Sequence, residues 1–245
     1  MDLAEYETMR AVEDAHWWYG ALRKRLKAQL EQASLPKPAR ILDAGCGTGG
    51  NLAMLTGFGE CIALDYALPA AAMAHERATR ARISLGSAEV MPLRDAACDA
   101  VLSADVWCHA GIRDVSRAAA ECYRVLRPGG VLILNLPAYP KLLSQHDRAV
   151  ANVRRFRQRE TLALLKNVGF VVEDAHYWNS LLLPAAMASR LLPFRGHETE
   201  SDLKASGNRF ISTIASAVLE TERHASRGLP LPCGLSILIR ARKTS

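Results

Sequence analysis

The sequence predicts an α/β fold built on a doubly wound parallel sheet. Short apolar segments alternate with helical patterns from residue 39 to residue 137, at the spacing of β–α–β units. The apolar segment 129–137 is nearly continuous, as expected for a strand that is covered on both faces. A glycine-rich turn at 45–50 follows the first apolar segment, where a doubly wound sheet opens its binding crevice.

Composition and charge favour a soluble enzyme with one domain. The chain has 245 residues, of which 49% are hydrophobic and 23% are charged, and this is ordinary for a globular domain. The net charge of +6 could attract nucleic acid or an anionic membrane. The basic runs at 23–27 and 154–159 lack the interleaved aromatic residues of a nucleic-acid surface. We therefore do not expect a nucleic-acid partner.

Cysteine usage predicts a cytoplasmic protein without a metal site. The six cysteines form no CxxC pair and no metal-ligand spacing, which favours free thiols in a reducing compartment. The N-terminal stretch MDLAEYETMR is polar and acidic, unlike a signal peptide. The most apolar segment, 180–194, is interrupted by Pro184 and Arg190 and is too short to span a bilayer. We expect no membrane span.

One N-terminal helix is predicted over residues 5–33. Leu22, Leu26 and Leu30 repeat every four residues and would form its buried face. The prolines in 35–38 end this helix, because proline removes a backbone donor and restricts the residue before it.

The elements of the core follow in chain order after a strand that contains Ile41 and Leu42. Each is predicted from an apolar run or from a four-residue repeat. They are a helix near 49–57, a strand at 61–65, a helix near 69–80, strands at 81–86 and 98–105, a helix with the stripe Val115, Ala119, Cys122 and Leu126, and a strand at 129–137.

The last part of the chain breaks this alternation. Its segments are a polar, basic connection at 138–157, a helix at 158–168, a strand at 170–178 and a final strand at 234–242. Phe210, Ile214 and Val218 repeat every four residues, which predicts an amphipathic helix over 203–226. Its apolar face either packs on the body of the fold or contributes to a site.

The turn in ARILDAGCGTGG indicates a ligand that approaches the backbone closely, because glycine leaves room that a Cβ would fill. Gly45, Gly47 and Gly50 fit the G-x-G-x-x-G spacing of dinucleotide sites. Gly45, Gly47 and Gly49 also fit the tighter G-x-G-x-G spacing. The glycines alone leave the ligand open.

Two acidic residues narrow the choice of ligand. Asp65 ends the second strand, where a carboxylate can accept hydrogen bonds from the hydroxyls of a ribose. Asp43 precedes the first glycine by two positions, and a fixed carboxylate there would repel a pyrophosphate. It would favour a ligand with a cationic end, and S-adenosylmethionine carries an ammonium and a sulfonium but no phosphate. The sequence therefore favours S-adenosylmethionine over NAD.

The chain carries four motifs in order: ILDAGCGTG, the acidic Asp65, GSAEVMPLRDAACDAVLS and AAAECYRVLRPGGVLIL. Together they resemble the successive motifs of the class I S-adenosylmethionine-dependent methyltransferases, in their type 11 subgroup. The resemblance implies a Rossmann-like sheet of seven strands, with an antiparallel last strand inserted between the fifth and sixth. It also divides the single domain 1–245 into four segments. They are an N-terminal helical segment (1–38), a cofactor-binding core (39–178), a helical cap inserted between the last two strands (179–233) and the last strand (234–245).

The resemblance also assigns cofactor contacts to individual positions. They are Asp43, Gly45, Gly47 and Gly49 for the methionine part, Asp65 for the ribose, Tyr66, Ser87 and Ala88 for the adenine, and Ala104 and Asp105 for the floor of the pocket. Many relatives have an aspartate at the position of Ser87. Serine is shorter and neutral, so the contact to the adenine amine would be weaker here or pass through the backbone or water.

Two segments could enclose this pocket. In the family's topology the sixth strand ends and the seventh begins at the carboxyl edge, which predicts that 179–233 is a lid or a substrate-recognition cap. Trp17, Trp18 and Tyr19 could close the pocket from the N-terminal helix, and Arg23 could meet the methionine carboxylate. The alternative is that the tryptophans only anchor the helix to the body of the fold.

Histidines near the carboxyl edge offer a general base. His146 with the adjacent Asp147 is the first candidate, and His109, just past the fourth strand, is the second. His176 is a third. An exposed loop histidine would instead be solvated. Contacts to the methyl acceptor are expected from Tyr139, Tyr177 and Asn179.

The sequence thus predicts methyl transfer from S-adenosylmethionine to a small molecule with an apolar part, with O-methylation slightly favoured over N- or C-methylation. An RNA or protein methyltransferase is an alternative that the basic charge supports. The [DN]-P-P-[YF] motif of nucleobase and glutamine methylation is absent, however, since SADVWCHAG stands after the fourth strand. A catalytically silent cofactor-binding subunit is the third hypothesis. No oligomeric state is predicted.

Overall fold

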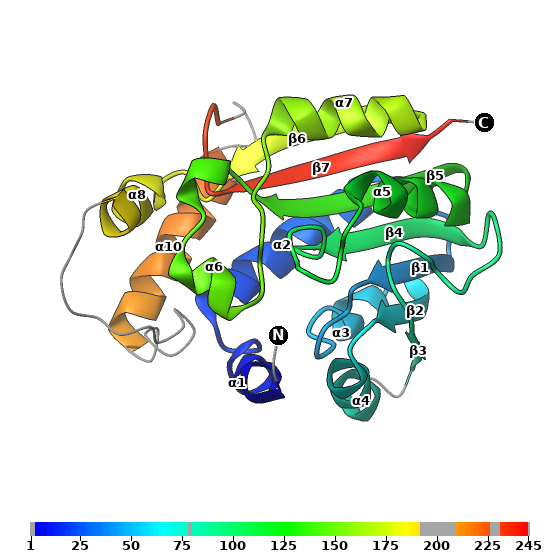
Figure 1. Ribbon diagram of the computed structural model, residues 1–245, viewed down its shortest axis with the longest axis horizontal. Helices are drawn as coiled ribbons and strands as arrows, with labels where there is room; N and C mark the ends of the chain where they lie inside the picture. Colours follow the sequence, from blue (N-terminus) through cyan, green and yellow to red (C-terminus); the bar gives the residue numbers. More distant parts are fainter. Residues whose placement is uncertain (1–2, 78–79, 192–208, 226–230, 245) are drawn as a thin grey trace.

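The computed structural model describes residues 3–77, 80–191, 209–225 and 231–244. Its centre is a seven-stranded sheet in the order β3-β2-β1-β4-β5-β7-β6 (Figure 1). The strands are β1 (Ala39–Ala44), β2 (Gly59–Asp65), β3 (Ala81–Leu85), β4 (Cys98–Ala104), β5 (Leu126–Pro137), β6 (Phe170–Trp178) and β7 (Ser236–Lys243). Only β7 runs antiparallel to its neighbours, β5 and β6. The predicted Rossmann-like sheet and its antiparallel last strand are confirmed.

Helices cover both faces of the sheet. They are α1 (Leu3–Val12), α2 (Trp17–Gln32), α3 (Leu52–Leu55), α4 (Leu68–Arg77), α5 (Val115–Val125), the 3-10 helix η1 (Pro140–Leu142), α6 (Gln145–Ala149), α7 (Gln158–Val168), α8 (Leu183–Leu191) and α10 (Arg209–Ala225). One buried cluster joins α5 and α7 to the sheet, and a second joins α2, α3, α4 and α10 to the opposite face. The strands are therefore apolar on both sides, as their sequences predict.

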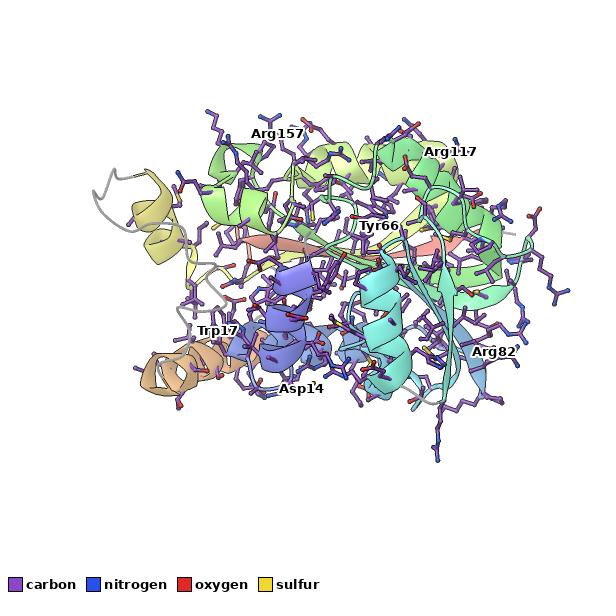
Figure 2. The ribbon with its side chains drawn as sticks, turned by 60° about the horizontal axis from the view of Figure 1, so that its bottom comes forward. Asp14, Trp17, Tyr66, Arg82, Arg117 and Arg157 are labelled. Atoms are coloured by element: carbon purple, nitrogen blue, oxygen red, sulfur yellow. The ribbon has the colours of Figure 1, made fainter. Side chains whose placement is uncertain are left out.

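The predicted single helix over 5–33 is wrong, because the chain breaks between α1 and α2. His16 caps the second helix, since its Nδ1 accepts a hydrogen bond from the backbone N–H of Trp18 at 3.2 Å. The guanidinium of Arg23 donates to the carbonyl oxygen of Glu13 at 2.9 Å and holds the two helices in a bend. The break sends α1 back across the molecule, where it lies beside α4 (Figure 2).

The buried stripe of α10 differs from the predicted one. Ile214 is 49% exposed, whereas Ala215, Leu219 and Glu222 are buried. The inner face lies one position further along because α10 packs against α2, on which Arg25 faces Glu222. The predicted residues 203–208, and the side chain of Phe210, lie outside the described residues.

Two other segments depart from their predicted outlines. The connection 138–157 contains η1 and α6, and α3 is much shorter than the helix predicted near 49–57. The glycine turn occupies the missing part of that helix, since Gly47 and Gly49 have φ values of +53° and +89°. None of the helices in the described residues has the length and apolar character to cross a membrane.

Candidate active site

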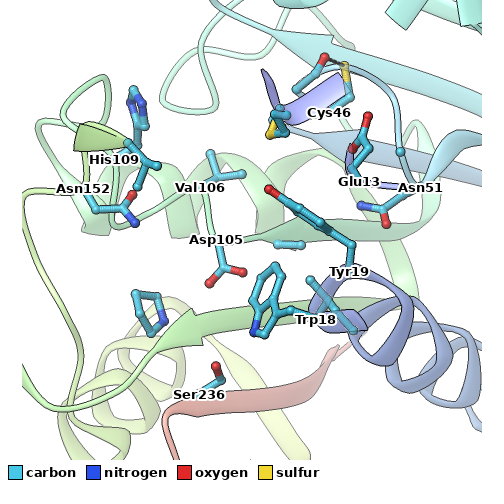
Figure 3. Close-up of a pocket in the computed structure, with 18 of the residues that line it drawn as sticks. Glu13, Trp18, Tyr19, Cys46, Asn51, Asp105, Val106, His109, Asn152 and Ser236 are labelled. Carbon is cyan, nitrogen blue, oxygen red and sulfur yellow. Dashed lines mark hydrogen bonds between the residues drawn. The ribbon is translucent and has the colours of Figure 1, made fainter. Parts of the chain in front are cut away.

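One cavity of about 650 Å³ lies at the carboxyl ends of the parallel strands. This volume is typical of a small-molecule site. Its walls come from α1, α2, the glycine turn after β1, the segment after β4, the connection between β5 and α7, and helices α8 and α10. Figure 3 shows Tyr19 and Asp105 near its centre.

Most residues predicted for the site line this cavity. They are Gly45, Gly47, Asp65, Tyr66, Ala88, Ala104, Asp105, His109, Asp147 and Asn179. The predicted residues that are not among its lining are Asp43, Gly49, Ser87, Tyr139 and Tyr177. The side chain of His146 lies outside the described residues. The aromatic group Trp17, Trp18 and Tyr19 and the basic Arg23 also line the cavity.

The glycine turn is held open at Gly45 by its neighbours. The backbone N–H groups of Gly45 and Cys46 both donate to the carbonyl oxygen of Leu64, at 2.7 and 3.0 Å. Gly45 has a φ of +95°, and a Cβ built on it would lie 2.2 Å from Cγ2 of Val106. A side chain at this position would therefore strain the turn. Without one, the backbone of the turn lies directly against the cavity.

Replacement of Gly45 by alanine should lower the free energy of unfolding by more than the cost of placing alanine at a positive φ. Gly129 is a matched control, because it has a φ of +77° but no atom within 4 Å of an added Cβ. The overlap with Val106 adds about 1–3 kcal/mol to the loss for Gly45→Ala. Urea unfolding of both variants measures this difference. Equal losses would contradict the described packing of Val106 on the turn.

Asp65 ends β2 and already organises the glycine turn. Its Oδ2 accepts a hydrogen bond from the N–H of Gly47 at 2.9 Å, and its Oδ1 accepts one from the N–H of Ala67 at 3.0 Å. Burial raises the pKa of Asp65, while these two N–H donors oppose the shift. Each oxygen retains a lone pair for a further donor, so the carboxylate can still hold hydroxyl groups.

Asp43 lies fully buried beneath the turn. Neither carboxylate oxygen has a hydrogen-bond partner of ordinary geometry among the described residues. Burial, together with the nearby charges of Asp65 and Glu13, raises the pKa of Asp43 from 3.8 to about 7. A buried carboxylate without a partner is costly, and a cationic group in the adjoining cavity would offset that cost.

Glu13 adds a third carboxylate to this region. It stands at the break between α1 and α2, where it accepts from the hydroxyl of Thr48 and pairs with Arg77 of α4. A Cβ on Gly50 would lie 2.2 Å from Oε2 of Glu13, so the turn and this side chain fit closely. Sequence reasoning missed Glu13, because it treated the region as the middle of one helix.

The adenine pocket predicted from the resemblance has Tyr66 as its outer wall. The ring of Tyr66 lies against Gly111, where an added Cβ would come within 2.9 Å of two ring atoms. Ala88 lines the cavity, whereas the hydroxyl of Ser87 accepts from the N–H of Glu89 at 3.1 Å. The Ser87 hydroxyl thus makes a hydrogen bond within its own turn and keeps one lone pair for a further donor.

His109 lies beside Tyr66, and its ring points away from Asp105 in Figure 3. Its Nδ1 accepts from the N–H of Gly111 at 3.2 Å, so we assign the proton to Nε2. Burial lowers the pKa of His109 to about 4, which keeps the ring neutral at pH 7. The lone pair that a base would use is therefore already engaged.

Asp147 forms a buried ion pair with Arg155 in the connection after β5. Arg155 donates to both carboxylate oxygens, at 2.7 and 3.1 Å, and the N–H and hydroxyl of Ser144 donate to Oδ2. Burial alone would raise the pKa of Asp147, but Arg155 and Ser144 outweigh it and lower the pKa. In this arrangement Asp147 holds Arg155 at the cavity wall.

The predicted acceptor contacts separate into two groups. Tyr139 and Tyr177 stack on each other, with ring centroids 5.6 Å apart, outside the cavity lining. Asn179 does line the cavity and is only 4% exposed. Its Oδ1 has no hydrogen-bond partner in the part of the chain that the structure describes. An acceptor with a polar hydrogen could supply that partner.

Much of the cavity lining that α2, α8, α10 and the residue before α8 supply is apolar. These residues are Trp17, Trp18, Leu22, Leu182, Ala186 and Ala215. Among residues 3–77, 80–191, 209–225 and 231–244, no group of three or more His, Cys, Asp or Glu side chains is placed to hold a metal ion.

Comparisons with known proteins agree with this geometry. Residues 42–134 match the family model described as a methyltransferase domain. The chain is 34% identical over 139 residues to a protein of Mycolicibacterium smegmatis named "Probable S-adenosylmethionine-dependent methyltransferase"; the match covers 55% of this chain and 52% of that protein. It is 41% identical over 111 residues to a malonyl-[acyl-carrier protein] O-methyltransferase of Serratia marcescens, which covers 44% and 42% of the two chains.

Solved structures share the whole fold. The structure of a geranyl diphosphate methyltransferase in complex with GPP and sinefungin superposes with a TM-score of 0.61 at 19% identity, and covers 92% of this chain and 78% of that chain. The chain spans about half the length of the curated relatives named above. The sequence matches thus concern about half of the chain, while the structural likeness covers 92% of it.

Proposed function

We propose that this chain, which belongs to the class I S-adenosylmethionine-dependent methyltransferases, transfers a methyl group from that cofactor to a small-molecule acceptor. The observation that carries the proposal is the acidic glycine turn: the fully buried Asp43 lies beneath it, and Asp65 and Glu13 stand beside it. Such a site suits a cofactor with an ammonium and a sulfonium, whereas it would repel a pyrophosphate.

The residues present fit S-adenosylmethionine. The backbone at Gly45 and Gly47, which carries no side chain, would receive the amino-acid part. Asp43 is buried beneath this turn, and its charge would act on the amino group through the turn. Asp65 would hold the ribose hydroxyls, and Tyr66 and Ala88 would enclose the adenine. When bound, the cofactor supplies an activated methyl group on a positively charged sulfur.

The cavity beyond the cofactor region supports a small acceptor with an apolar part. Its apolar walls come from α2, α8 and α10, and Asn179 offers an unpartnered oxygen for a polar group. O-methylation is our first choice, in line with the O-methyltransferase named among the relatives. N- and C-methylation remain the alternatives, because an amine or a carbanion would use the same positioning.

The other chemical classes are weaker candidates. A protein or RNA acceptor would require an edge of that macromolecule to reach a cavity that is walled by α1, α2 and the cap. A catalytically silent subunit would not need an acceptor space beside the cofactor region. We also propose a cytoplasmic location, which the free and buried thiols of Cys46, Cys61, Cys98, Cys108 and Cys122 support.

Asp65→Ala tests the assignment of the ribose site. The substitution removes charge-assisted hydrogen bonds worth about 1.5–3 kcal/mol, so the affinities for S-adenosylmethionine and S-adenosylhomocysteine should fall about 10- to 150-fold. Calorimetric titration measures both affinities, and circular dichroism checks that the variant is folded. A folded variant with unchanged affinity would refute this role for Asp65.

Transfer of a labelled methyl group decides the acceptor class. The protein is incubated with methyl-labelled S-adenosylmethionine and a cell extract, and the label is separated into solvent-extractable small molecules, RNA and protein. We expect protein-dependent label in the small-molecule fraction. Label confined to RNA or to protein would exclude a small acceptor. A protein that binds the cofactor tightly but transfers no label would favour the hypothesis of a catalytically silent subunit.

A further inference from the structure

We infer that Asp105 is a catalytic carboxylate, whose Oδ1 faces the site of methyl transfer and takes the proton that the acceptor loses. This inference rests on the proposed function. The resemblance gives Asp105 only a place on the cofactor floor, and the sequence predicts the base at His146 with Asp147, at His109 or at His176.

The first support is that hydrogen bonds hold the backbone and one carboxylate oxygen of Asp105 in place. Its backbone adopts a φ of +56°, which is uncommon for a residue with a side chain and typical of a position that a site demands. The Nδ2 of Asn135 donates to its Oδ2 at 2.8 Å, and its own N–H donates to the carbonyl of Asn135 at 2.9 Å. Trp178 in turn donates from Nε1 to Oδ1 of Asn135 at 2.8 Å.

This chain of hydrogen bonds orients one carboxylate oxygen and leaves the other toward the cavity. Asn135 and Trp178 are buried on β5 and β6, so they cannot rotate freely. Among the described residues, no hydrogen bond reaches Oδ1 of Asp105. Because Asp105 lines the cavity, this oxygen is available to a ligand.

The second support is the place of Asp105 between the two parts of the cavity. Val106, its neighbour, touches the glycine turn at Gly45 on the cofactor side. On the other side, Figure 3 shows Trp18 and Ser236 below the carboxylate, and both line the cavity. The boundary between cofactor and acceptor is where a transferred group must pass.

The third support is the charge of the surroundings. Burial raises the pKa of Asp105 to about 7, although the hydrogen bond from Asn135 and the charge of Arg155 oppose this shift. Asp147 is the other charged group that acts on it, and Tyr19 and Cys108 face it as neutral groups whose own pKa values are raised by burial. A base with a pKa near the working pH is well suited to accept a proton.

Two of the competing groups, His109 and Asp147, are less available. Nδ1 of His109 accepts from the N–H of Gly111, and Asp147 is committed to Arg155. In the transfer step, Oδ1 of Asp105 accepts the proton of the acceptor hydroxyl as that oxygen bonds to the methyl carbon and the carbon–sulfur electron pair returns to sulfur. The proton then leaves to water when the product departs.

The test compares S-adenosylmethionine with S-adenosylhomocysteine, which differ only in the methyl group and the positive charge on sulfur. Their calorimetric dissociation constants are measured from pH 5.5 to pH 8. An ionised Asp105 near the sulfur should favour the charged ligand. The ratio of the dissociation constant of S-adenosylhomocysteine to that of S-adenosylmethionine should therefore rise about tenfold as the pH rises through 7. Asp105→Asn should abolish this rise while both ligands still bind.

Asp43→Asn is the matched control. The pKa of Asp43 is also about 7, but its proposed partner is the amino group that both ligands share. Its loss should therefore weaken the binding of both ligands and leave the ratio of their dissociation constants rising with pH. A ratio that is flat in the unaltered protein, or that still rises in Asp105→Asn, overturns the inference. If neither ligand binds at all, the proposed function falls as well.

The labelled-methyl assay tests the proton transfer itself. Asp105→Asn should lower turnover on the labelled small-molecule fraction about 10²–10⁴-fold at pH 8. Full turnover by this variant would overturn the catalytic role even if the binding ratio behaved as expected.

Discussion

Replacement of Glu222 by alanine is expected to lower the free energy of unfolding by about 3–5 kcal/mol, because it leaves a buried charge without its partner. The side chains of Glu222 and Arg25 are 1% and 6% exposed and lie 3.2 Å apart. Arg25 also packs over the ring of Trp178, with its guanidinium carbon 4.5 Å from the ring centroid. The pair thus joins α10, α2 and the end of β6.

Glu222 also satisfies the backbone where the cap begins. The N–H groups of Asn179, Ser180 and Leu181 donate to its carboxylate at 2.6, 2.7 and 3.0 Å. Alanine would leave these three donors unpaired as well. Since Asn179 lines the cavity, the loss should also weaken binding of any acceptor that fills the cap side.

Glu220 is a matched control on the same helix. It pairs with Lys24 of α2 at 3.1 Å, but the two side chains are 34% and 60% exposed. Glu220→Ala should therefore cost about 1 kcal/mol or less. Urea unfolding of both variants measures the contrast, and equal losses would show that the buried pair does not hold the cap to α2.

Asp43→Asn is expected to flatten the pH dependence of stability. The pKa of Asp43 is raised from 3.8 to about 7 in the folded protein. A group with a raised folded pKa contributes stability that is fully present below its unfolded pKa and is lost as the pH rises through its folded pKa. The ligand-free protein should thus lose stability from about pH 4 to pH 8, and the variant should lose about 2–4 kcal/mol less.

Thermal and urea unfolding at pH 5 and pH 8 measure this difference, and Asp95→Asn is the control because that carboxylate is 81% exposed. The control should follow the unaltered protein. A variant whose stability falls with pH as steeply as the unaltered protein would show that Asp43 is not a strained buried carboxylate. If Asp43 serves the amino group of the cofactor as proposed, the same variant should also bind S-adenosylmethionine more weakly.

Strand and helix order in the core could be predicted from the sequence, because apolar runs and four-residue repeats depend on neighbours along the chain. The break between α1 and α2 could not. It depends on Glu13 meeting Thr48 and Arg77, contacts that join distant parts of the sequence. The shifted stripe of α10 has the same cause, since Arg25 draws the polar Glu222 inward.

The cofactor side of the site was more predictable than the acceptor side. Gly45, Gly47 and Asp65 stand in an ordered motif, and the end of each parallel strand falls at one edge. The proposed acceptor side is built from α2, α8, α10 and the connection after β5, which come together only through tertiary packing. Sequence reasoning could name Asp105 but could not foresee that Asn135 orients it.

The central claim is that the acidic glycine turn binds S-adenosylmethionine. Calorimetric titration of the protein with S-adenosylmethionine, S-adenosylhomocysteine and NAD in parallel tests it most directly. We predict micromolar binding of the first two and none of NAD. Binding of NAD alone would contradict the account, because it would show that Asp43 and Glu13 do not exclude a pyrophosphate from this turn.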